Sequence, residues 1–390
     1  MADPVIAPVR ILFVDHAPFV GGAETVMLDL IAHLDRSRFE PIACVPPASP
    51  LSKLLDARGM EWCSLSMPRL NVPSPLMPVR WLSAARRLAR LAREQRIDLI
   101  HANTVRAHLI SAFVRGTPIV WMLHDDTFPR RLFTALRRRA AWLIANSRAT
   151  ARYYGIEGDS KASVVYNGID TTAAPGNRSA FRRQFGIDPD ALVVAHVGRL
   201  ARWKGQDVFA RAAARIAPTF PDARFMLVGT FAEDDEARGE LGGGAAYEAE
   251  LRQLAGSSGL GNSLIFAGHQ DNMADVYAGI DLLIHSSTRP EPFGRVIIEA
   301  MSASLPVIAS AHGGPAEIVE DGVTGLLVPP GESNRLAQVM SGLLNDAPRR
   351  QAMGSAARQR ACERFDIRQQ VEAVQSIYLN VIRENQSRRH

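Results

Sequence analysis

Two glutamates in the C-terminal half could bind hydroxyl groups, and the backbone between them could bind an anion. Glu291 lies in a proline-containing turn, and Glu299, with seven residues between the two, lies in a predicted helix. We expect this helix to begin near Phe293. The amides of Phe293, Gly294 and Arg295 would then lack partners within the helix, and together with the helix dipole they suit an anion. A glycine within the turn lets a ligand approach the backbone closely.

This combination of groups matches the chemistry of a nucleotide-sugar. The diphosphate would lie on the amides, the sugar hydroxyls on one carboxylate and the ribose hydroxyls on the other. The alternative is an ordinary strand, turn and amphipathic helix with two solvated glutamates, which is the commoner meaning of two glutamates at this spacing alone. The pattern therefore needs support from other parts of the chain.

Two further segments follow predicted strands and could contact phosphate. Gly21 and Gly22 separate the first strand from a helix, although a plain tight turn explains them equally well. Arg199 and Lys204 share one loop and could converge on a diphosphate, Arg as a planar fork and Lys as a point charge. Two exposed cations are the alternative. The Gly21 segment is not a G-x-G-x-x-G fingerprint and the chain has no G-K-[ST] sequence, which disfavours dinucleotide and P-loop sites.

His124 ends a predicted strand and is a candidate catalytic residue. Side chains that follow strands gather where open α/β sheets bind ligands. A single histidine at a strand end is more often structural, so this assignment stays open on position alone. The competing histidines are His16, His101, His269, His285 and His312.

The elements that would position these residues alternate between apolar β-rich runs and helical periodicity, which predicts α/β layers with mostly parallel sheets. Turn-forming residues from 167 to 177 mark a domain boundary. We expect an N-terminal domain of residues 1–170, a C-terminal domain of residues 171–365 and a last helix of residues 366–390. Two consecutive open α/β domains imply a cleft between them.

The individual elements follow from the same patterns. We expect an irregular loop over 68–78 and a Gly-rich insertion over 239–246. The predicted strands are 9–15, 41–45, 62–66, 98–102, 119–123, 142–145, 163–166, 192–197, 224–228, 264–267, 282–285 and 307–309. The principal predicted helices are 25–34, 333–345, 348–365 and 367–385.

The composition fits a soluble globular protein, with 47% hydrophobic and 22% charged residues. The sequence has no run of 18 apolar residues and no N-terminal secretory pattern, and its three cysteines are scattered. We therefore expect reduced thiols and a cytoplasmic location.

The positive charge is concentrated in the first 170 residues, which contain 22 basic and 15 acidic residues. Two Arg-rich helices could lie on an anionic bilayer or bind an acidic acceptor, which would make the protein peripheral at the inner face of the membrane. The alternative is a solvated helix face. No aromatic and basic platform accompanies the charge, so we expect no nucleic-acid partner. The arginines of these helices are Arg80, Arg86, Arg87, Arg90, Arg93, Arg96, Arg130, Arg131, Arg137, Arg138 and Arg139.

The ordered set of segments resembles glycosyltransferase family 4, the retaining GT-B group that uses nucleotide-sugars. The resemblance extends over nearly the whole chain. The segments that carry it are Gly21-Gly22-Ala23-Glu24, His124, Ala145-Asn146-Ser147, Val165–Asp170, Gly198-Arg199-Leu200, Lys204-Gly205, Gly268, Glu291-Pro292-Phe293-Gly294, Glu299-Ala300-Met301 and Gly313–Glu317.

The resemblance implies a GT-B fold, in which two Rossmann-like domains face a central cleft and the last helix crosses back to the N-terminal domain. It implies that the C-terminal domain holds most of the donor. Arg199 and Lys204 would bind the diphosphate, Glu299 would bind the ribose, and Glu291 would bind the sugar together with the Phe293–Gly294 amides.

The remaining assignments are also implied by the resemblance. Gly21 and Gly22 would approach the donor from the N-terminal domain, and His124 would lie beside the reacting carbon and the acceptor. His269 and Gln270 would lie near the base. Pro292 belongs to the donor-binding turn, and Arg295 contributes only its amide, because relatives often have an apolar residue there.

The family transfers a hexose from a UDP- or GDP-sugar to a hydroxyl of a glycan, a lipid-linked or a small-molecule acceptor, with retention, no cofactor and no obligatory metal. Such chemistry needs stabilisation of the leaving group more than a strong base. The segment Thr230–Ala246 is longer and richer in glycine than in the family, so it leaves base and sugar preference open. Two other readings also stay open: a nucleotide-sugar 2-epimerase, and a non-catalytic nucleotide-sugar-binding protein.

Overall fold

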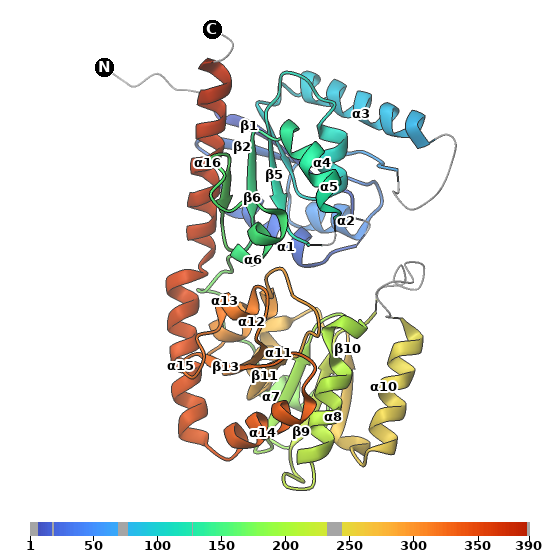
Figure 1. Ribbon diagram of the computed structural model, residues 1–390, viewed down its shortest axis with the longest axis vertical. Helices are drawn as coiled ribbons and strands as arrows, with labels where there is room; N and C mark the ends of the chain where they lie inside the picture. Colours follow the sequence, from blue (N-terminus) through green and yellow to red (C-terminus); the bar gives the residue numbers. More distant parts are fainter. Residues whose placement is uncertain (1–6, 18, 69–76, 127, 232–243, 388–390) are drawn as a thin grey trace. The chain divides into compact units, whose positions relative to one another are not determined.

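The computed structural model describes residues 7–17, 19–68, 77–126, 128–231 and 244–387. Most of the predicted loop 68–78 and of the Gly-rich segment 239–246 lies outside these ranges. The chain divides into two compact units. Unit 1 contains the residues up to Gly168 and from Ile367 onward, and unit 2 contains Ile169–Asp366. Each unit has one parallel sheet with helices on both faces (Figure 1).

Unit 1 has a seven-stranded sheet in the order β3-β2-β1-β4-β5-β6-β7, with every adjacent pair parallel. The strands are β1 Val9–Val14, β2 Phe39–Val45, β3 Trp62–Ser64, β4 Leu99–Ala102, β5 Ile119–Leu123, β6 Trp142–Ala145 and β7 Ala162–Val164. The helices are α1 Gly22–His33, α2 Pro50–Ala57, α3 Met77–Glu94, α4 Val105–Ser111, α5 Arg130–Leu136, α6 Arg148–Tyr154 and α16 Ile367–Ser387, with a 3-10 turn η1 at Arg137–Arg139.

Alternation along β1 shows why both faces of this sheet are covered. Ile11 and Phe13 point into a core built with α1, α2 and α16, while Leu12 and Val14 point into a core built with α3, α4 and α6. Successive side chains of a strand point to opposite faces, so an uninterrupted apolar strand has to be buried on both sides. The continuous apolar run of β1 thus requires a doubly wound layer.

The last helix belongs to unit 1. Residues of α16, including Val374 and Tyr378, join the core formed by α1 and the sheet. The Tyr378 hydroxyl lies 2.7 Å from His101 Nδ1, and His101 stacks on Phe13 with ring centroids 4.8 Å apart. Burial lowers the pKa of His101 to about 3. His101, one of the competing histidines, is therefore a neutral core residue.

Unit 2 has a six-stranded parallel sheet in the order β10-β9-β8-β11-β12-β13. The strands are β8 Val193–Val197, β9 Arg224–Val228, β10 Leu264–Gly268, β11 Leu282–His285, β12 Val307–Ser310 and β13 Gly325–Val328. The helices are α7 Arg178–Gln184, α8 Gln206–Ile216, α10 Ala245–Ser257, α11 Met273–Gly279, α12 Arg295–Ser302, α13 Pro315–Ile318, α14 Ser333–Leu344 and α15 Ala347–Arg364, with 3-10 turns η2 at Arg202–Lys204 and η3 at Gly261–Ser263.

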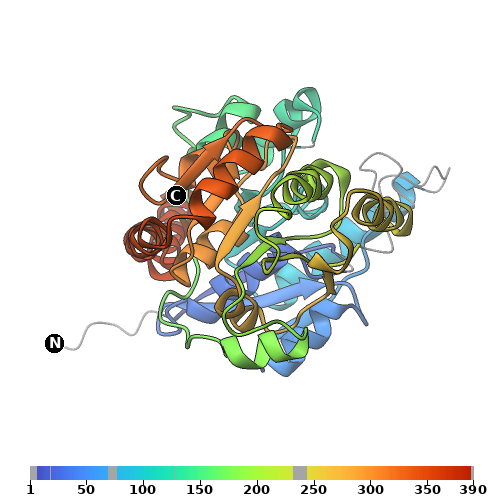
Figure 2. The same ribbon diagram turned by 90° about the horizontal axis from the view of Figure 1, so that it is seen from below.

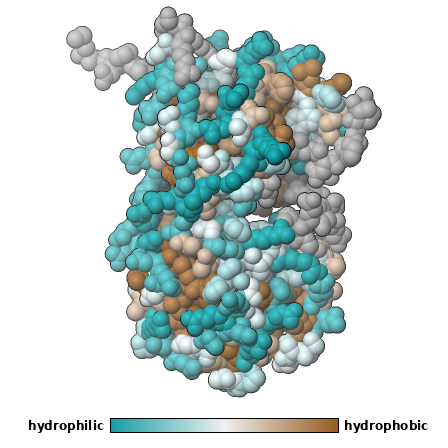
Figure 3. Space-filling view, viewed as in Figure 1, coloured by the Kyte–Doolittle hydropathy of each residue, from teal (hydrophilic) through white to brown (hydrophobic). Residues whose placement is uncertain are grey.

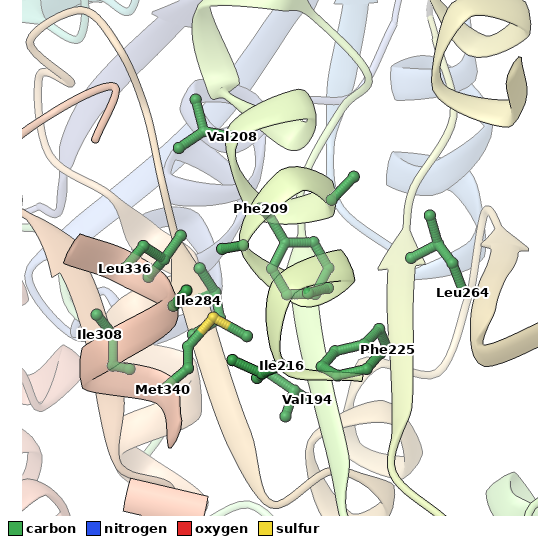
Figure 4. Packing of buried hydrophobic residues seen from close by; sticks show 14 of the residues in the cluster. Val194, Val208, Phe209, Ile216, Phe225, Leu264, Ile284, Ile308, Leu336 and Met340 are labelled. Carbon is green, nitrogen blue, oxygen red and sulfur yellow. The ribbon is translucent and has the colours of Figure 1, made fainter. Parts of the chain in front are cut away.

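The core of unit 2 lies between the sheet and the helices α8, α10 and α14. Figure 4 shows Phe209 of α8 above Phe225 of β9, and Met340 of α14 close to Ile284 of β11. Figure 2 shows α8 and α10 side by side, and both contribute to this core. The packing fixes the strand ends that carry the candidate residues.

Several sequence-based boundaries differ from the structure. The helix expected near Phe293 begins at Arg295, with Gly294 as its N-cap, because Gly294 has a left-handed φ of 100° that a helical residue cannot adopt. Helix α3 begins at Met77, inside the predicted loop, since proline is tolerated in a first helical turn. Strand β13 was not predicted, although turn-forming residues precede and follow its short apolar run.

Each sheet has one position where the strand order reverses: between β1 and β4 in unit 1, and between β8 and β11 in unit 2. Open α/β sheets bind ligands beyond the carboxyl ends of the strands at such positions. The residues that follow these four strands are therefore the first candidates for a functional site.

Candidate active site

A mostly buried ion pair lies at the reversal point of unit 2. Lys204 Nζ donates to both carboxylate oxygens of Glu291, at 2.6 and 2.7 Å, and the two side chains are 16% and 12% exposed. Ser287 Oγ donates to Glu291 Oε2 at 3.0 Å, and His285 Nε2 lies 3.1 Å from the same oxygen. Three side chains thus meet at the Glu291 carboxylate: Lys204 from the loop after β8, His285 from the end of β11 and Ser287 from the loop that follows.

This cluster keeps Glu291 ionised. Burial alone would raise the pKa of Glu291, but the positive charge of Lys204 and the hydrogen bond from His285 outweigh it, and the pKa lies well below its ordinary value. A neighbouring cation and hydrogen bonds to the charged form both favour the carboxylate. Glu291 therefore acts as a hydrogen-bond acceptor and not as an acid.

The two loops are held together by close backbone contacts. Gly205 has a φ of 72°, and a Cβ there would lie 2.0 Å from the carbonyl oxygen of Ser286. Ser286 Oγ donates to the Gly205 carbonyl at 2.7 Å, and the Thr288 amide donates to the Trp203 carbonyl at 2.8 Å. Only glycine combines this backbone conformation with this approach. The glycine after Lys204 thus positions the lysine against Glu291.

The turn that carries Glu291 is fixed from its other side. The Gly314 amide donates to the Glu291 carbonyl at 2.7 Å, and a Cβ on Gly313, whose φ is 65°, would lie 2.4 Å from that oxygen. The Phe293 side chain is 3% exposed and packs edge-on against Phe365. Phe293 can therefore offer a ligand only its backbone.

Glu299 is held by two side chains that the sequence analysis did not assign. Arg295 Nε donates to Glu299 Oε1 at 2.7 Å, and the Tyr277 hydroxyl donates to Oε2 at 2.7 Å. Burial raises the pKa of Tyr277 well above its ordinary value, and the charge of Glu299 adds to this. Tyr277 therefore stays a donor, and Arg295 contributes a side-chain contact beyond the amide that the sequence analysis gave it.

The other predicted donor residues lie in the loops that follow β8 and β10. Arg199 is the second residue after β8 and is half-buried, and its carbonyl accepts a hydrogen bond from Gln206 at 2.8 Å. His269 and Gln270 follow β10, the edge strand, and His269 is 71% exposed beside Asp271. Within the described ranges, no hydrogen bond links His269 or Gln270 to the Lys204–Glu291 cluster or to Glu299.

At the reversal point of unit 1, Gly21 and Gly22 form the start of α1. Gly21 is the N-cap, and its amide donates to Glu24 Oε2 at 2.8 Å. A Cβ on Gly22 would meet no atom within 4 Å. Both glycines therefore belong to a capped helix start, and Gly22 has open space above its backbone.

Among the residues that the structure describes, the His124 ring has one hydrogen-bond partner. Its Nε2 lies 2.9 Å from Asn103 Oδ1, and Asn103 Nδ2 donates to Asp15 Oδ2 at 2.6 Å and to the Ala23 carbonyl at 3.2 Å. Burial lowers the pKa of His124 to about 4, so the ring is neutral near pH 7. Asp15, Asn103 and His124 follow β1, β4 and β5 respectively.

The comparisons with known proteins cover both units. Residues 177–360 match the family model described as glycosyl transferases group 1, and residues 20–173 match the model described as Glycosyltransferase Family 4. The crystal structure of Anabaena HepE with UDP and glucose is 30% identical, with a TM-score of 0.82 over 94% of this chain and 98% of that chain. The chain belongs to glycosyltransferase family 4. The expected GT-B fold of two Rossmann-like domains is confirmed.

Relatives of this glycosyltransferase are named as enzymes that transfer sugars. The lipopolysaccharide core biosynthesis mannosyltransferase LpsB of Rhizobium meliloti is 29% identical over 252 residues, which are 64% of this chain and 68% of LpsB. The D-inositol 3-phosphate glycosyltransferase of Mycobacterium sp. (strain KMS) is 36% identical over 204 residues, or 51% of this chain. This match spans 43% of the length of that relative.

Several residues at the site were missed by the sequence analysis. Asp15 and Asn103 are polar residues directly after strands, and that position is the signal that could have found them. His285 was named only as a competing histidine, yet it contacts Glu291. No spacing signal links Tyr277 to Glu299, because the two are 22 residues apart in different helices.

Proposed function

We propose that this glycosyltransferase moves a hexose from a UDP- or GDP-sugar to a hydroxyl of a glycan, lipid-linked or small-molecule acceptor, with retention and without a metal. The observation that carries the proposal is the arrangement at the reversal point of unit 2. There, two carboxylates and a lysine lie on the loops after β8 and β11 and on the helix that follows.

Each donor residue then has a distinct role. Lys204 and Arg199 neutralise the diphosphate as it leaves, since fixed positive charge stabilises a developing anion without reorganisation. Glu291 and the amides at the start of α12 orient the sugar, and Glu299 accepts hydrogen bonds from the ribose. We assign His124 of unit 1 to the sugar and acceptor.

UDP-sugars are the first donors to test, because the HepE structures contain UDP with glucose and UDP-glucose. A screen of UDP-, GDP- and ADP-sugars by thermal shift ranks donors by affinity, since a ligand that binds only the folded state raises the melting temperature. We expect a rise with one base and not with the others. A melting temperature unchanged by every nucleotide-sugar would contradict donor binding.

Product analysis separates transfer from the two other activities. NMR of the product formed with the identified donor should show the anomeric configuration of the donor, and activity should persist in EDTA. A nucleotide-sugar epimerised in the absence of an acceptor would instead indicate a 2-epimerase. Bound donor with neither transfer nor hydrolysis would indicate a non-catalytic binding protein.

We also propose that unit 1 contacts an anionic bilayer through the surface formed by residues 77–94, 105–116 and 129–140. These segments contain twelve arginines, no lysine and one acidic residue, Glu94. Phe113 is 59% exposed and Leu132 55%, and Figure 3 shows hydrophobic atoms among hydrophilic ones over the part of the surface that α3 forms. None of the helices in the described ranges is long and apolar enough to cross a membrane.

A groove on this surface is lined by both arginine and apolar side chains. It has a volume of about 170 Å³, and its walls include Leu82, Phe113, Arg86, Arg115 and Arg139. Arginine side chains attract lipid phosphates, and exposed apolar side chains enter the headgroup region.

Flotation with phosphatidylglycerol vesicles at low salt tests this contact. We expect the wild type to float, and a variant with Arg86, Arg115 and Arg139 changed to Glu to remain at the bottom of the gradient. The matched control changes three exposed arginines of unit 2, Arg211, Arg335 and Arg349, to Glu. The proposed bilayer contact would be discarded if both triple variants lost flotation, or if the wild type did not float.

A further inference from the structure

The ring of His124 is held by a chain of buried polar groups that the proposed chemistry does not use directly. Asp15 and Asn103 are both fully buried. They directly follow two adjacent strands, β1 and β4, and the contact passes from the Asp15 carboxylate through the Asn103 amide to His124 Nε2. Buried polar groups are costly unless they are fully paired, so this arrangement needs a reason.

One backbone carbonyl fixes which atom of Asn103 donates and which accepts in these hydrogen bonds. The oxygen of Ala23 can only accept a hydrogen bond, so the group of Asn103 that lies 3.2 Å away must be its NH2. The same NH2 reaches Asp15 Oδ2 at 2.6 Å, and Asp15 Oδ1 is occupied by the Ala17 amide at 2.7 Å. The amide oxygen of Asn103 therefore points to His124, whatever the protonation state of Asp15.

A carbonyl oxygen as partner fixes the proton on the imidazole. Because Asn103 Oδ1 can only accept, His124 Nε2 must carry the hydrogen and donate it across 2.9 Å. In a neutral ring the lone pair is then on Nδ1. We propose that Asp15 and Asn103 are positioning residues that hold His124 as the neutral Nε2–H tautomer, so that Nδ1 accepts a hydrogen bond from a hydroxyl of the sugar or the acceptor.

The identity of the hydroxyl rests on the proposed function. Within that function, the role of His124 is restricted to accepting a hydrogen bond. A neutral ring with its lone pair on Nδ1 cannot supply positive charge to the diphosphate. That charge is left to Lys204 and Arg199 in unit 2. His124 instead selects ligands that present a hydroxyl, since a buried acceptor discriminates strongly against a partner that cannot donate.

Long-range proton–nitrogen NMR of histidine-labelled protein tests the tautomer without any substrate. Signals of His124 are assigned by their loss in His124→Gln. We expect one Nε2–H tautomer in the wild type and a mixture in Asn103→Leu. Asn103→Asp, which keeps an oxygen toward Nε2, should keep the hydrogen on Nε2. Asn146→Leu is the control: the hydrogen bond of Asn146 to His124 goes to the backbone carbonyl, at 3.4 Å, and its other side-chain partner is Thr150, so this variant should leave the ring signals unchanged.

The proposal would be overturned if the wild-type His124 ring were protonated or were the Nδ1–H tautomer. An unchanged His124 ring in Asn103→Leu would also overturn it. Enzyme kinetics then connect the tautomer of His124 to turnover. With the identified donor, Asn103→Leu should lower kcat on the order of 100-fold, the contribution typical of one positioned polar group. The Kd for UDP should stay within about twofold, because a weaker hydroxyl contact leaves nucleotide binding intact. If the protein transfers no sugar, the NMR result still decides the tautomer, so the two failures are distinguishable.

Discussion

Lys204 Nζ lies 2.6 and 2.7 Å from the two carboxylate oxygens of Glu291, so one ammonium group neutralises one carboxylate inside unit 2. The pair joins two loops that are 87 residues apart in sequence. Both side chains are mostly buried, so removal of either charge leaves the other without its counter-ion in a largely water-free site. The pair therefore links the stability of unit 2 to the site that we assign to the donor.

Separate and combined replacement of this pair should distinguish stability from activity. Lys204→Met leaves the Glu291 charge buried without its cation and should cost about 3 kcal/mol of unfolding free energy, whereas the double variant Lys204→Met/Glu291→Gln should recover much of that loss. Chemical unfolding measures the stability. Turnover should fall at least roughly 100-fold in all the variants, including the stable double variant. A double variant that regains turnover would show that the pair serves only the fold.

Tyr277 should affect donor binding through Glu299. Tyr277→Phe removes one of the two hydrogen bonds that hold the Glu299 carboxylate, a bond worth about 1.5 kcal/mol to a charged group. We expect the KM for the donor to rise roughly tenfold with kcat nearly unchanged. The matched control is Tyr247→Phe, because Tyr247 hydrogen-bonds Asp207 in the same unit. Equal effects in both variants would mean that Tyr277 acts only on stability.

Gly205 should tolerate no side chain. Gly205→Ala places a Cβ 2.0 Å from the Ser286 carbonyl oxygen at a φ of 72°, so the loop that carries Lys204 must move. We expect a loss of at least about 2 kcal/mol in stability, together with most of the turnover. Gly342→Ala is the control: Gly342 lies within α14 with open space around it, and the substitution should stabilise by about 0.5 kcal/mol. Thermal unfolding of both variants compares the two positions, and a fully active Gly205→Ala would contradict the assigned geometry.

Buried histidines should make stability fall on acidification. Burial lowers the pKa of His108 to about 4 from an ordinary 6.5. Between these values the unfolded chain takes up the proton first, so this contribution is complete above about pH 6.5 and is lost as the pH falls toward 4. His108→Phe keeps a ring against Trp121 and removes the titration. The slope of unfolding free energy between pH 5 and 6 should decrease by about 1.4 kcal/mol per pH unit. An unchanged slope in a urea-unfolding series would refute this.

The alternation of apolar runs was enough to predict α/β layers with parallel sheets, and the family resemblance supplied the GT-B fold. The contacts within the loops that carry Lys204 and Glu291 were predicted less completely. Strands such as Ile119–Leu123 and Leu282–His285 have the predicted bounds, because a fully buried parallel strand is apolar on both faces. Glu291 and Lys204 could be named because both lie in loops directly after strands. Their mutual contact could not be predicted, since it depends on how Gly205 brings the two loops together.

The side chains that support the site escaped prediction for a physical reason. Asn103 and Tyr277 act by holding another residue, and their partners lie 21 and 22 residues away in sequence. Contacts of this kind are set by sheet order and helix packing, neither of which leaves a periodic trace in a single sequence. The helix start was misplaced at Phe293, because the left-handed conformation of Gly294 becomes visible only in three dimensions.

The position of α16 has a consequence for how this polypeptide is made. Its residues Val374 and Tyr378 complete the core of unit 1, yet they leave the ribosome only after all of unit 2 has been synthesised. Unit 2 can fold while it emerges, whereas the first 168 residues must wait with an apolar surface of α1 and the sheet uncovered. The part of the chain translated first is therefore the last to reach its native state, and during that interval it is the part most in need of a chaperone.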